Sequence, residues 1–256
     1  MTYHYTDTYT RLRQDLIMRQ VPHFLLIGNG RVARHFQHYF KLLSLSFETW
    51  HRQEPLADLY QKAATASHIL LLISDKAIPT FIEQHLKNTQ AYRIHFSGSL
   101  VTDLAFGAHP LMTFNTELYE LKCYQSLSFV LDHDAPDFSA LLPGLANASV
   151  RLHTSLKPKY HAFCVLSGNF SCLLWQKFFS SLEQEFHIPP AMAYPYLFQI
   201  TQNISVNPNT ALTGPLVRND KETIEKNLMA LQADPFQKIY QSFVDCYRSL
   251  TEEMLK

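Results

Sequence analysis

The residues best suited to chemistry come early, at a glycine-containing turn. Residues 24–36 read FLLIGNGRVARHF, an apolar run that stops at two glycines and continues in a helix-like pattern. They form the spacing G-x-G-x-x-A, in which the first glycine permits a tight turn, the second admits a pyrophosphate to the backbone and the small third residue allows close packing. A plain strand-to-helix turn also uses glycine, but the alternation of strands and helices around this turn favours dinucleotide binding at the helix N-terminus. The cofactor-binding residues predicted here are Gly28, Asn29, Gly30, Arg31, Val32 and Ala33.

The end of the second predicted strand distinguishes between the two pyridine nucleotides. An NAD site usually has an acidic residue about 20 positions after the glycines, which binds the ribose 2′-hydroxyl. Here the strand ends in Trp50-His51-Arg52, and Arg52 with His51 beside it can bind a 2′-phosphate, so NADP, used as NADPH, is the predicted cofactor. Glu48 lies further inside the strand and is a poorer ribose ligand, and the alternative for Arg52 is a solvated loop charge. Ser74, at the end of the third apolar run, completes the predicted cofactor site.

Short apolar strands alternate with helix-like segments through the first half of the chain. The predicted strands are 23–27, 44–50, 68–74, 93–96 and 126–131, and the predicted helices are 32–43, 56–66 and 78–87. Nearly continuous apolar strands separated by helices are typical of a parallel sheet covered on both faces. We therefore expect an α/β domain of the Rossmann type, with a doubly wound parallel sheet and right-handed connections, over residues 21–150. Residues 1–20 form a predicted N-terminal extension without an assigned role.

The pattern changes after about residue 151. Residues 159–184 are apolar nearly all round and too long for a strand, which predicts a buried helix. Further helix-like stretches follow at 191–204, 221–232 and 235–254. We therefore expect an all-helical C-terminal domain over residues 151–256 for substrate binding and dimerisation. Its aromatic series is interpreted as core or dimer-interface packing and comprises Phe163, Phe170, Trp175, Phe178 and Phe179.

The composition of the chain argues against several classes of binding partner. The 22 basic and 22 acidic residues leave no net charge and form no basic cluster, so neither nucleic acid nor a membrane surface is an expected partner. Four cysteines without a CxxC pair favour buried, reduced thiols, and the chain shows no secretory signal or run of ~20 apolar residues, so we expect a cytoplasmic protein. The 13 histidines show no HExxH pattern, and the Asp132-His133-Asp134 trio is interpreted as capping a loop, so no metal site is predicted.

Five motifs follow one another along the chain: GNGRVA, HFSGSL, GAHPLMTF, YHAFCVLSGNF and ALTGPLVRND. In this order they resemble the Rossmann-like family with a helical C-terminal domain of formerly unknown function, which is related to ketopantoate reductase, pyrroline-carboxylate reductase and 6-phosphogluconate dehydrogenase. The resemblance covers most of residues 22–250 and implies an NADPH-dependent reductase of a small 2-oxo acid. Members similar to alternative ketopantoate reductases make pantoate from 2-dehydropantoate in pantothenate synthesis. A homodimer is implied by the same analogy. One departure is Asn219, where the family usually has glycine, although asparagine tolerates positive φ.

Reduction of a ketone by a nicotinamide needs close placement and a group that protonates or polarises the carbonyl oxygen. Histidine suits this role near neutral pH, and His161 stands where the related enzymes keep a lysine on the long helix, with Asn169 in the part that carries their asparagine. The two are eight residues apart, about 80° around a helix, so both can face one side of an interdomain cleft. We predict His161 as the proton donor and Asn169 as the anchor of the substrate carbonyl or hydroxyl. The alternatives are a satisfied core histidine and an asparagine that bonds a neighbouring backbone.

Three loops supply candidate substrate ligands. Ser97 and Gly98 can offer a hydroxyl and backbone N–H groups to a carboxylate, or form a simple strand-ending turn. His109, stiffened by the following proline, can be a second acid or a contact to the cofactor ring, or a surface residue. Arg218 can clamp the carboxylate in a bidentate manner, or pair with Asp220, which is predicted to cap the next helix. The alternative to an enzyme is a catalytically silent, NADP-binding regulatory protein, for which the missing lysine is the main argument.

Overall fold

A computed structural model describes residues 22–254, so the predicted N-terminal extension, residues 1–20, lies outside the described residues. The chain divides into two compact units, the first ending at Leu173 and the second beginning at Leu174. This division falls inside the long helical segment, downstream of the change near residue 150 that the sequence pattern predicts.

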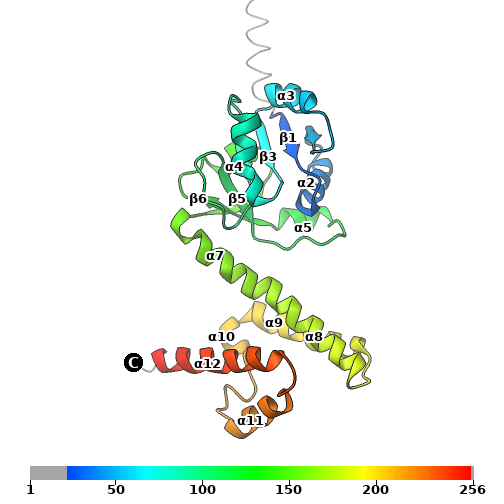
Figure 1. The fold of residues 1–256 in the computed structure, drawn as a ribbon, viewed down its shortest axis with the longest axis vertical. Helices are drawn as coiled ribbons and strands as arrows, with labels where there is room; N and C mark the ends of the chain where they lie inside the picture. Colours follow the sequence, from blue (N-terminus) through cyan, green and yellow to red (C-terminus); the bar gives the residue numbers. More distant parts are fainter. Residues whose placement is uncertain (1–21, 255–256) are drawn as a thin grey trace, which may run out of the picture. The chain divides into compact units, whose positions relative to one another are not determined.

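The first unit is built on a seven-stranded sheet in the order β2-β1-β3-β4-β5-β6-β7. Figure 1 labels β1, β3, β5 and β6 of this sheet. Neighbouring strands run parallel except β5 and β6, which pair antiparallel, with Ala108 opposite Leu131. The predicted α/β fold of the Rossmann type is therefore confirmed, with the sheet mostly rather than wholly parallel. The strands are β1 (Phe24–Ile27), β2 (Phe47–Trp50), β3 (His68–Leu71), β4 (Tyr92–His95), β5 (Phe106–Pro110), β6 (Ser128–Asp132) and β7 (Ala148–Leu152).

Two of these strands were not predicted, for different reasons. The sequence of β5, FGAHP, contains glycine and proline, which are depleted in strands, and β7 is an exposed edge strand that buries little apolar surface. The helical segments of the first unit are α2 (Arg31–Leu42), α3 (Leu56–Thr65), η1 (Asp75–Ala77), α4 (Ile78–Phe81), η2 (Ile82–Leu86), α5 (Leu121–Gln125), α6 (Phe138–Leu141), η3 (Thr154–Leu156), α7 (Lys157–Cys164) and η4 (Val165–Phe170).

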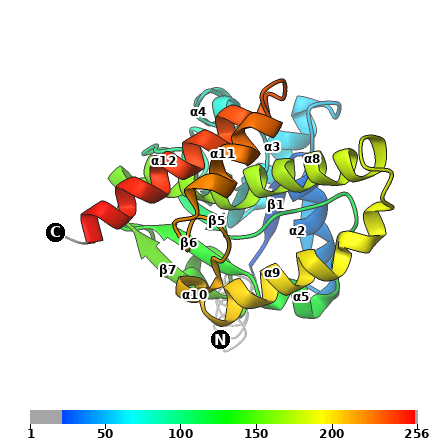
Figure 2. The same cartoon turned by 90° about the horizontal axis from the view of Figure 1, so that it is seen from below.

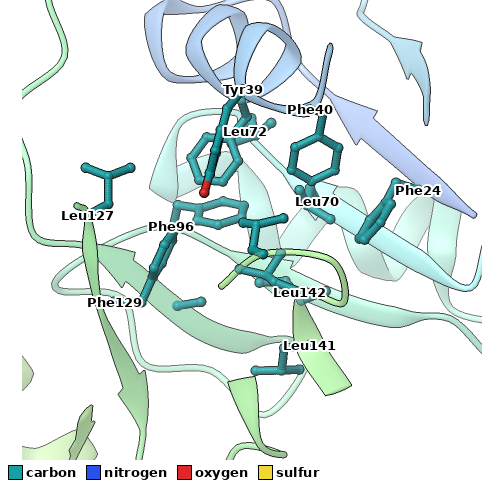
Figure 3. Close-up of a cluster of buried hydrophobic side chains, with 14 of the residues drawn as sticks. Phe24, Tyr39, Phe40, Leu70, Leu72, Phe96, Leu127, Phe129, Leu141 and Leu142 are labelled. Atoms are coloured by element: carbon teal, nitrogen blue, oxygen red, sulfur yellow. The ribbon is translucent and has the colours of Figure 1, made fainter. Parts of the chain in front are cut away.

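The strand residues point alternately to two hydrophobic cores, one on each face of the sheet. Phe24 and Leu26 belong to the core under α2, whereas Leu25 and Ile27 belong to the core under α3, α4 and η2. Figure 3 shows Tyr39 and Phe40 pointing from α2 toward side chains of the sheet. All of these side chains are fully or almost fully buried, and burial of each large apolar side chain contributes about 1.5–3 kcal/mol. The two cores therefore explain why nearly continuous apolar strands lie between covering helices.

The second unit consists of helices in the described part of the chain, as Figures 1 and 2 show. Trp175 contacts Phe179 and Tyr196 through its ring, and Lys177 pairs with Asp234 at 2.6 Å. These contacts join the end of the long helical segment to the helices that follow it. The segments are α8 (Ser171–Gln184), which begins just before the division, η5 (Pro190–Ala193), α9 (Tyr194–Val206), α10 (Pro208–Ala211), α11 (Lys221–Ala230) and α12 (Phe236–Met254).

Two expectations about burial are wrong. The chain is helical from Lys157 to Gln184, but this segment is not a buried helix: Phe163 is 57% exposed and Phe170 is 49% exposed. A nearly all-apolar helical sequence predicts burial but does not say which partner provides it. The four cysteines are free, yet Cys172 and Cys246 are exposed and the other two are half-buried.

Candidate functional site

The turn after β1 has a backbone that only glycine adopts without strain. Gly28 has φ +133°, and its N–H donates to the carbonyl oxygen of Trp50 at 2.8 Å. A Cβ on Gly28 would lie 2.2 Å from the carbonyl oxygen of Leu72, well inside contact distance. This glycine therefore lets the turn pass between the ends of β2 and β3.

Gly30 has a different role, because no protein atom lies close to the position that its side chain would occupy. It caps the N-terminus of α2 with an ordinary φ of −76°, and a Cβ built on it would meet nothing within 4 Å. The first turn of α2 contains no acidic residue. Free N–H groups and the positive end of the helix dipole therefore face an open space that suits an anion. Ala33 is fully buried, consistent with close packing of α2 on the sheet.

A cavity of about 790 Å³ extends from this turn past the ends of β2 and β3 to Phe96 and Ser97. Its volume lies within the range of about 300–1,000 Å³ that is usual for cofactor and ligand sites. Ala33 is the one predicted cofactor residue that does not line it. Those that do are Gly28, Asn29, Gly30, Arg31, Val32, His51, Arg52 and Ser74.

Of the two charged residues compared in the sequence, Arg52 is available at the cavity and Glu48 is not. Arg52 lines the cavity, is exposed and makes no side-chain hydrogen bond or ion pair with any residue in the described part of the chain. Glu48 pairs with His23 at 3.1 Å, near the opposite end of the strand. A free guanidinium is therefore available at the cavity, whereas the nearby strand carboxylate is engaged elsewhere.

Two predicted substrate-binding residues, Gly98 and His109, meet the predicted proton donor His161 where β4 and β5 approach α7. A Cβ on Gly98 would lie 2.6 Å from Cδ2 of His161 and 3.0 Å from Nε2 of His109, so both rings lie against this glycine. The centroids of the two rings are 6.1 Å apart. His109 Nδ1 lies 2.8 Å from the hydroxyl of Tyr160, within hydrogen-bonding distance. Gly98 therefore makes room for a cluster of two imidazoles and a phenol.

Burial controls the protonation of His109 and Tyr160. Burial, reinforced by positive charge at His161 and Lys157, lowers the pKa of His109 to about 4. Burial also raises the pKa of the Tyr160 hydroxyl. At neutral pH the pair is thus a neutral imidazole and a protonated phenol. When the Tyr160 hydroxyl donates to Nδ1, the ring proton of His109 lies on Nε2, the nitrogen that faces Gly98.

The Ser97 hydroxyl is already engaged by its neighbours. It donates to Oδ2 of Asp75 at 2.5 Å and accepts from the backbone N–H groups of Ser99 and Leu100. Both Ser97 and Asp75 line the cavity. In this arrangement Ser97 shapes the loop and holds Asp75 at the cavity wall.

Sequence reasoning missed a buried ion pair next to this cluster. Lys157 Nζ lies 2.6 Å from Oδ1 of Asp132, whose Oδ2 accepts from the N–H of Gly107 at 2.7 Å. The interpretation of Asp132 as a loop cap is therefore wrong, because its carboxylate binds α7 and β5 instead. The available signal was spacing: Lys157 precedes His161 by four residues, which places both on one helix face.

His95 is a second buried group that the sequence did not single out. Its Nδ1 accepts from the N–H of Ser97 at 3.3 Å, and its Nε2 has no partner within the described residues. Burial, with a further contribution from Lys157, lowers the pKa of His95 to about 4. The residue is therefore neutral under ordinary conditions.

Residues 132–252 match the family model described as a domain of unknown function, DUF2520. No curated protein sequence matches the chain. Among solved structures, a candidate NADP oxidoreductase from Bacteroides fragilis is similar with a TM-score of 0.71 and 18% identity, over 89% of this chain and 98% of that one. A reductive aminase from Aspergillus terreus, in complex with NADPH and ethyl levulinate, is similar with a TM-score of 0.56 and 13% identity, over 91% of this chain and 95% of that one. Pyrroline carboxylate reductase from Plasmodium falciparum, with NADP bound, is similar with a TM-score of 0.53 and 10% identity, over 91% of this chain and 99% of that one. At these identities the likeness shows a shared fold.

The DUF2520 match contains the two remaining predicted site residues, Asn169 and Arg218. Asn169 is exposed in the π-helical segment η4, where wider hydrogen-bond spacing alters the 80° separation from His161 that a regular helix would give. Arg218 is exposed in the second unit. Asp220 caps α11 by accepting from the N–H of Thr223 at 3.0 Å, which confirms its predicted role. Asn219 adopts φ +52°, as asparagine can.

Two other classes of site are not found among residues 22–254. No group of three or more His, Cys, Asp or Glu side chains there is arranged to hold a metal ion. No helix in that range is long and apolar enough to span a bilayer.

Proposed function

We propose that this protein is an NADP-dependent oxidoreductase that reduces a carbonyl group in a small 2-oxo acid. The observation that carries the proposal is the open cavity at the N-terminus of α2, which runs from Gly30 and Arg52 to Ser97. The similar structures of a candidate NADP oxidoreductase, a reductive aminase with NADPH and a pyrroline carboxylate reductase with NADP support this class of activity.

The residues around the cavity fit a phosphorylated dinucleotide. The space at Gly30 and the absence of an acidic residue from the first turn of α2 suit a pyrophosphate. Arg52, with His51 beside it, suits the 2′-phosphate that distinguishes NADP from NAD, and a guanidinium binds phosphate in a bidentate manner. Ser74 and Ser97 continue the lining toward the other end of the cavity.

Bound NADPH would supply a hydride, so the protein must place the carbonyl group and deliver a proton. His161 is the proposed proton donor to the developing alkoxide because its ring lies against Gly98, beside the strand ends. His109, held by Tyr160, is proposed to polarise the same oxygen as a neutral N–H donor. The backbone of Gly98 and the side chains of Asn169 and Arg218 are the proposed ligands of the substrate hydroxyl and carboxylate.

The narrower substrate proposal is 2-dehydropantoate, reduced to pantoate in pantothenate synthesis. It rests on the motif resemblance, because the reductive aminase and the pyrroline carboxylate reductase support only the broader class of reductases. A steady-state assay that follows NADPH consumption with a panel of 2-oxo acids and cyclic imines tests the proposal. Turnover is expected with at least one oxo acid and fastest with 2-dehydropantoate. Tight NADPH binding without turnover of any compound would instead favour the catalytically silent, regulatory alternative.

A homodimer is part of the proposal. Four exposed apolar side chains recur at helical spacing along α7, η4 and the start of α8: Phe163, Leu166, Phe170 and Leu173. Such a face supports burial against a second copy of the chain. Light scattering during size-exclusion chromatography should give twice the chain mass of 29.6 kDa, and a monomer mass would contradict this part of the proposal.

A further inference from the structure

Two residues of opposite charge, Arg52 and Glu54, lie in the turn that follows β2. Arg52 and Gln53 line the cavity, whereas Glu54 does not. The Glu54 carboxylate is nevertheless close, because Oε1 accepts from the N–H of His51 at 3.0 Å and lies 3.5 Å from Nε2 of the same residue. His51 itself lines the cavity. A carboxylate capable of binding a ribose hydroxyl, or of repelling a phosphate, therefore contacts His51 and follows the predicted 2′-phosphate ligand Arg52 by two positions.

Lys62 holds this carboxylate in place. From α3, its Nζ lies 3.2 Å from Oε2 of Glu54 and donates to the carbonyl oxygen of Thr49 at 2.8 Å. The lysine thus bridges α3, the last residues of β2 and the turn after it. Burial raises the pKa of the Glu54 carboxyl, but the hydrogen bonds from Lys62 and His51 outweigh burial and the net pKa is lowered. Glu54 is consequently charged and needs the lysine as its counter-ion.

We propose that Lys62 is a specificity-determining residue for the nucleotide, because it neutralises Glu54 and holds it away from the adenosine 2′-phosphate. The inference rests on the proposed function, since it assigns the phosphate of NADP to the end of β2. Without the lysine, the Glu54 carboxylate keeps only its contacts with His51 and loses its lysine counter-ion, two positions after Arg52 in the sequence. It then repels a 2′-phosphate and competes for the guanidinium, while it can accept a hydrogen bond from the 2′-hydroxyl of NAD.

Affinities of NADPH and NADH for Lys62→Met test the inference. The ratio of NADPH to NADH affinity should fall by about fivefold, as expected for loss of one partly exposed charge interaction. Lys62→Gln removes the charge but keeps a donor for the Thr49 carbonyl, so it should give the same change if Lys62→Met folds poorly. Lys87→Met is the matched control: it removes an exposed lysine that lines neither the cavity nor this turn, and the ratio should stay unchanged.

The double variant Lys62→Met/Glu54→Gln separates the effect of the Glu54 charge from the effect of losing the contacts by which Lys62 bridges α3 and the end of β2. Because the freed carboxylate is the cause in this proposal, removing it should restore the NADPH preference. The role of Lys62 is overturned if the folded Lys62 variants keep the wild-type ratio of NADPH to NADH affinity. It is also overturned if this ratio is as low in the double variant as in Lys62→Met. In both cases the oxidoreductase proposal stands. If the wild-type chain binds neither nucleotide, the proposed function fails, and this inference with it.

Discussion

Lys157 and Asp132 form an ion pair of 2.6 Å in which both side chains are almost completely buried, at 5% and 7% exposure. Lys157 begins α7, and His161 follows on the same face one turn later. Asp132 ends β6 and is bound in turn by the backbone of β5, the strand that carries His109. The pair therefore joins the helix and the strand that supply the two imidazoles of the candidate site.

Loss of either partner should destabilise the first unit strongly, because the other charge is then buried without compensation. For Lys157→Met we expect a loss of about 3–5 kcal/mol in the free energy of unfolding, measured by urea denaturation. Lys157→Met combined with Asp132→Leu should recover much of that loss. Similar stabilities of the wild-type and Lys157→Met chains would contradict the ion pair.

Stability should fall in mild acid because His95 and His109 are buried and neutral. Their folded pKa values of about 4 lie below the ordinary value of 6.5, so the unfolded chain binds more protons between these limits. The free energy of unfolding should therefore be fully retained above pH 6.5, decrease as pH falls toward 4 and level off below that for these two groups. Urea titrations across this range measure the slope, and His95→Asn should make it shallower. An unchanged slope would show that His95 is protonated in the folded chain.

The two glycines of the turn should respond differently to alanine. Gly28→Ala places a Cβ 2.2 Å from the Leu72 carbonyl oxygen, so it should lower the melting temperature through a loss of roughly 1–3 kcal/mol. Gly30→Ala meets no protein atom and should nearly preserve the melting temperature. Its methyl group occupies the space proposed for the pyrophosphate, so NADPH affinity should fall by about tenfold, or roughly 1.4 kcal/mol. An unaffected affinity in Gly30→Ala would move the phosphate away from this turn.

His161 should matter for turnover more than for binding. His161→Ala is expected to lower kcat about 100-fold or more, as for loss of a general acid, while the Kd for NADPH stays near the wild-type value. His109→Ala serves as the comparison, since both rings contact Gly98. A normal kcat in His161→Ala with a large loss in His109→Ala would transfer the proton-donor role to His109.

The fold was predictable because its signals are local and repeated. Apolar strands such as 24–27 and 68–71 are buried on both faces, so their composition alone indicates a covered sheet. The strand FGAHP gives no such signal, because a glycine and a proline are tolerated there by pairing that depends on distant residues. The antiparallel junction of β5 with β6 is likewise a tertiary feature.

The candidate site was predictable in part for the same reason. Gly98, His109 and His161 lie in motifs at strand ends or on the long helix, and they do come together. Lys157 and Asp132 are 25 positions apart and look like ordinary surface charges in the sequence; only the chain's path makes them a buried pair. The long apolar helix shows the converse, since its composition predicts burial that the single chain does not provide at Phe163.

The most direct measurement is a calorimetric titration of the purified full-length chain with NADPH and, separately, with NADH. The cavity at Gly30 and the free guanidinium of Arg52 predict saturable binding of NADPH with one site per chain and weaker binding of NADH. Absence of saturable binding for both nucleotides, with the protein folded, would contradict the assignment of the cavity and the reductase proposed from it.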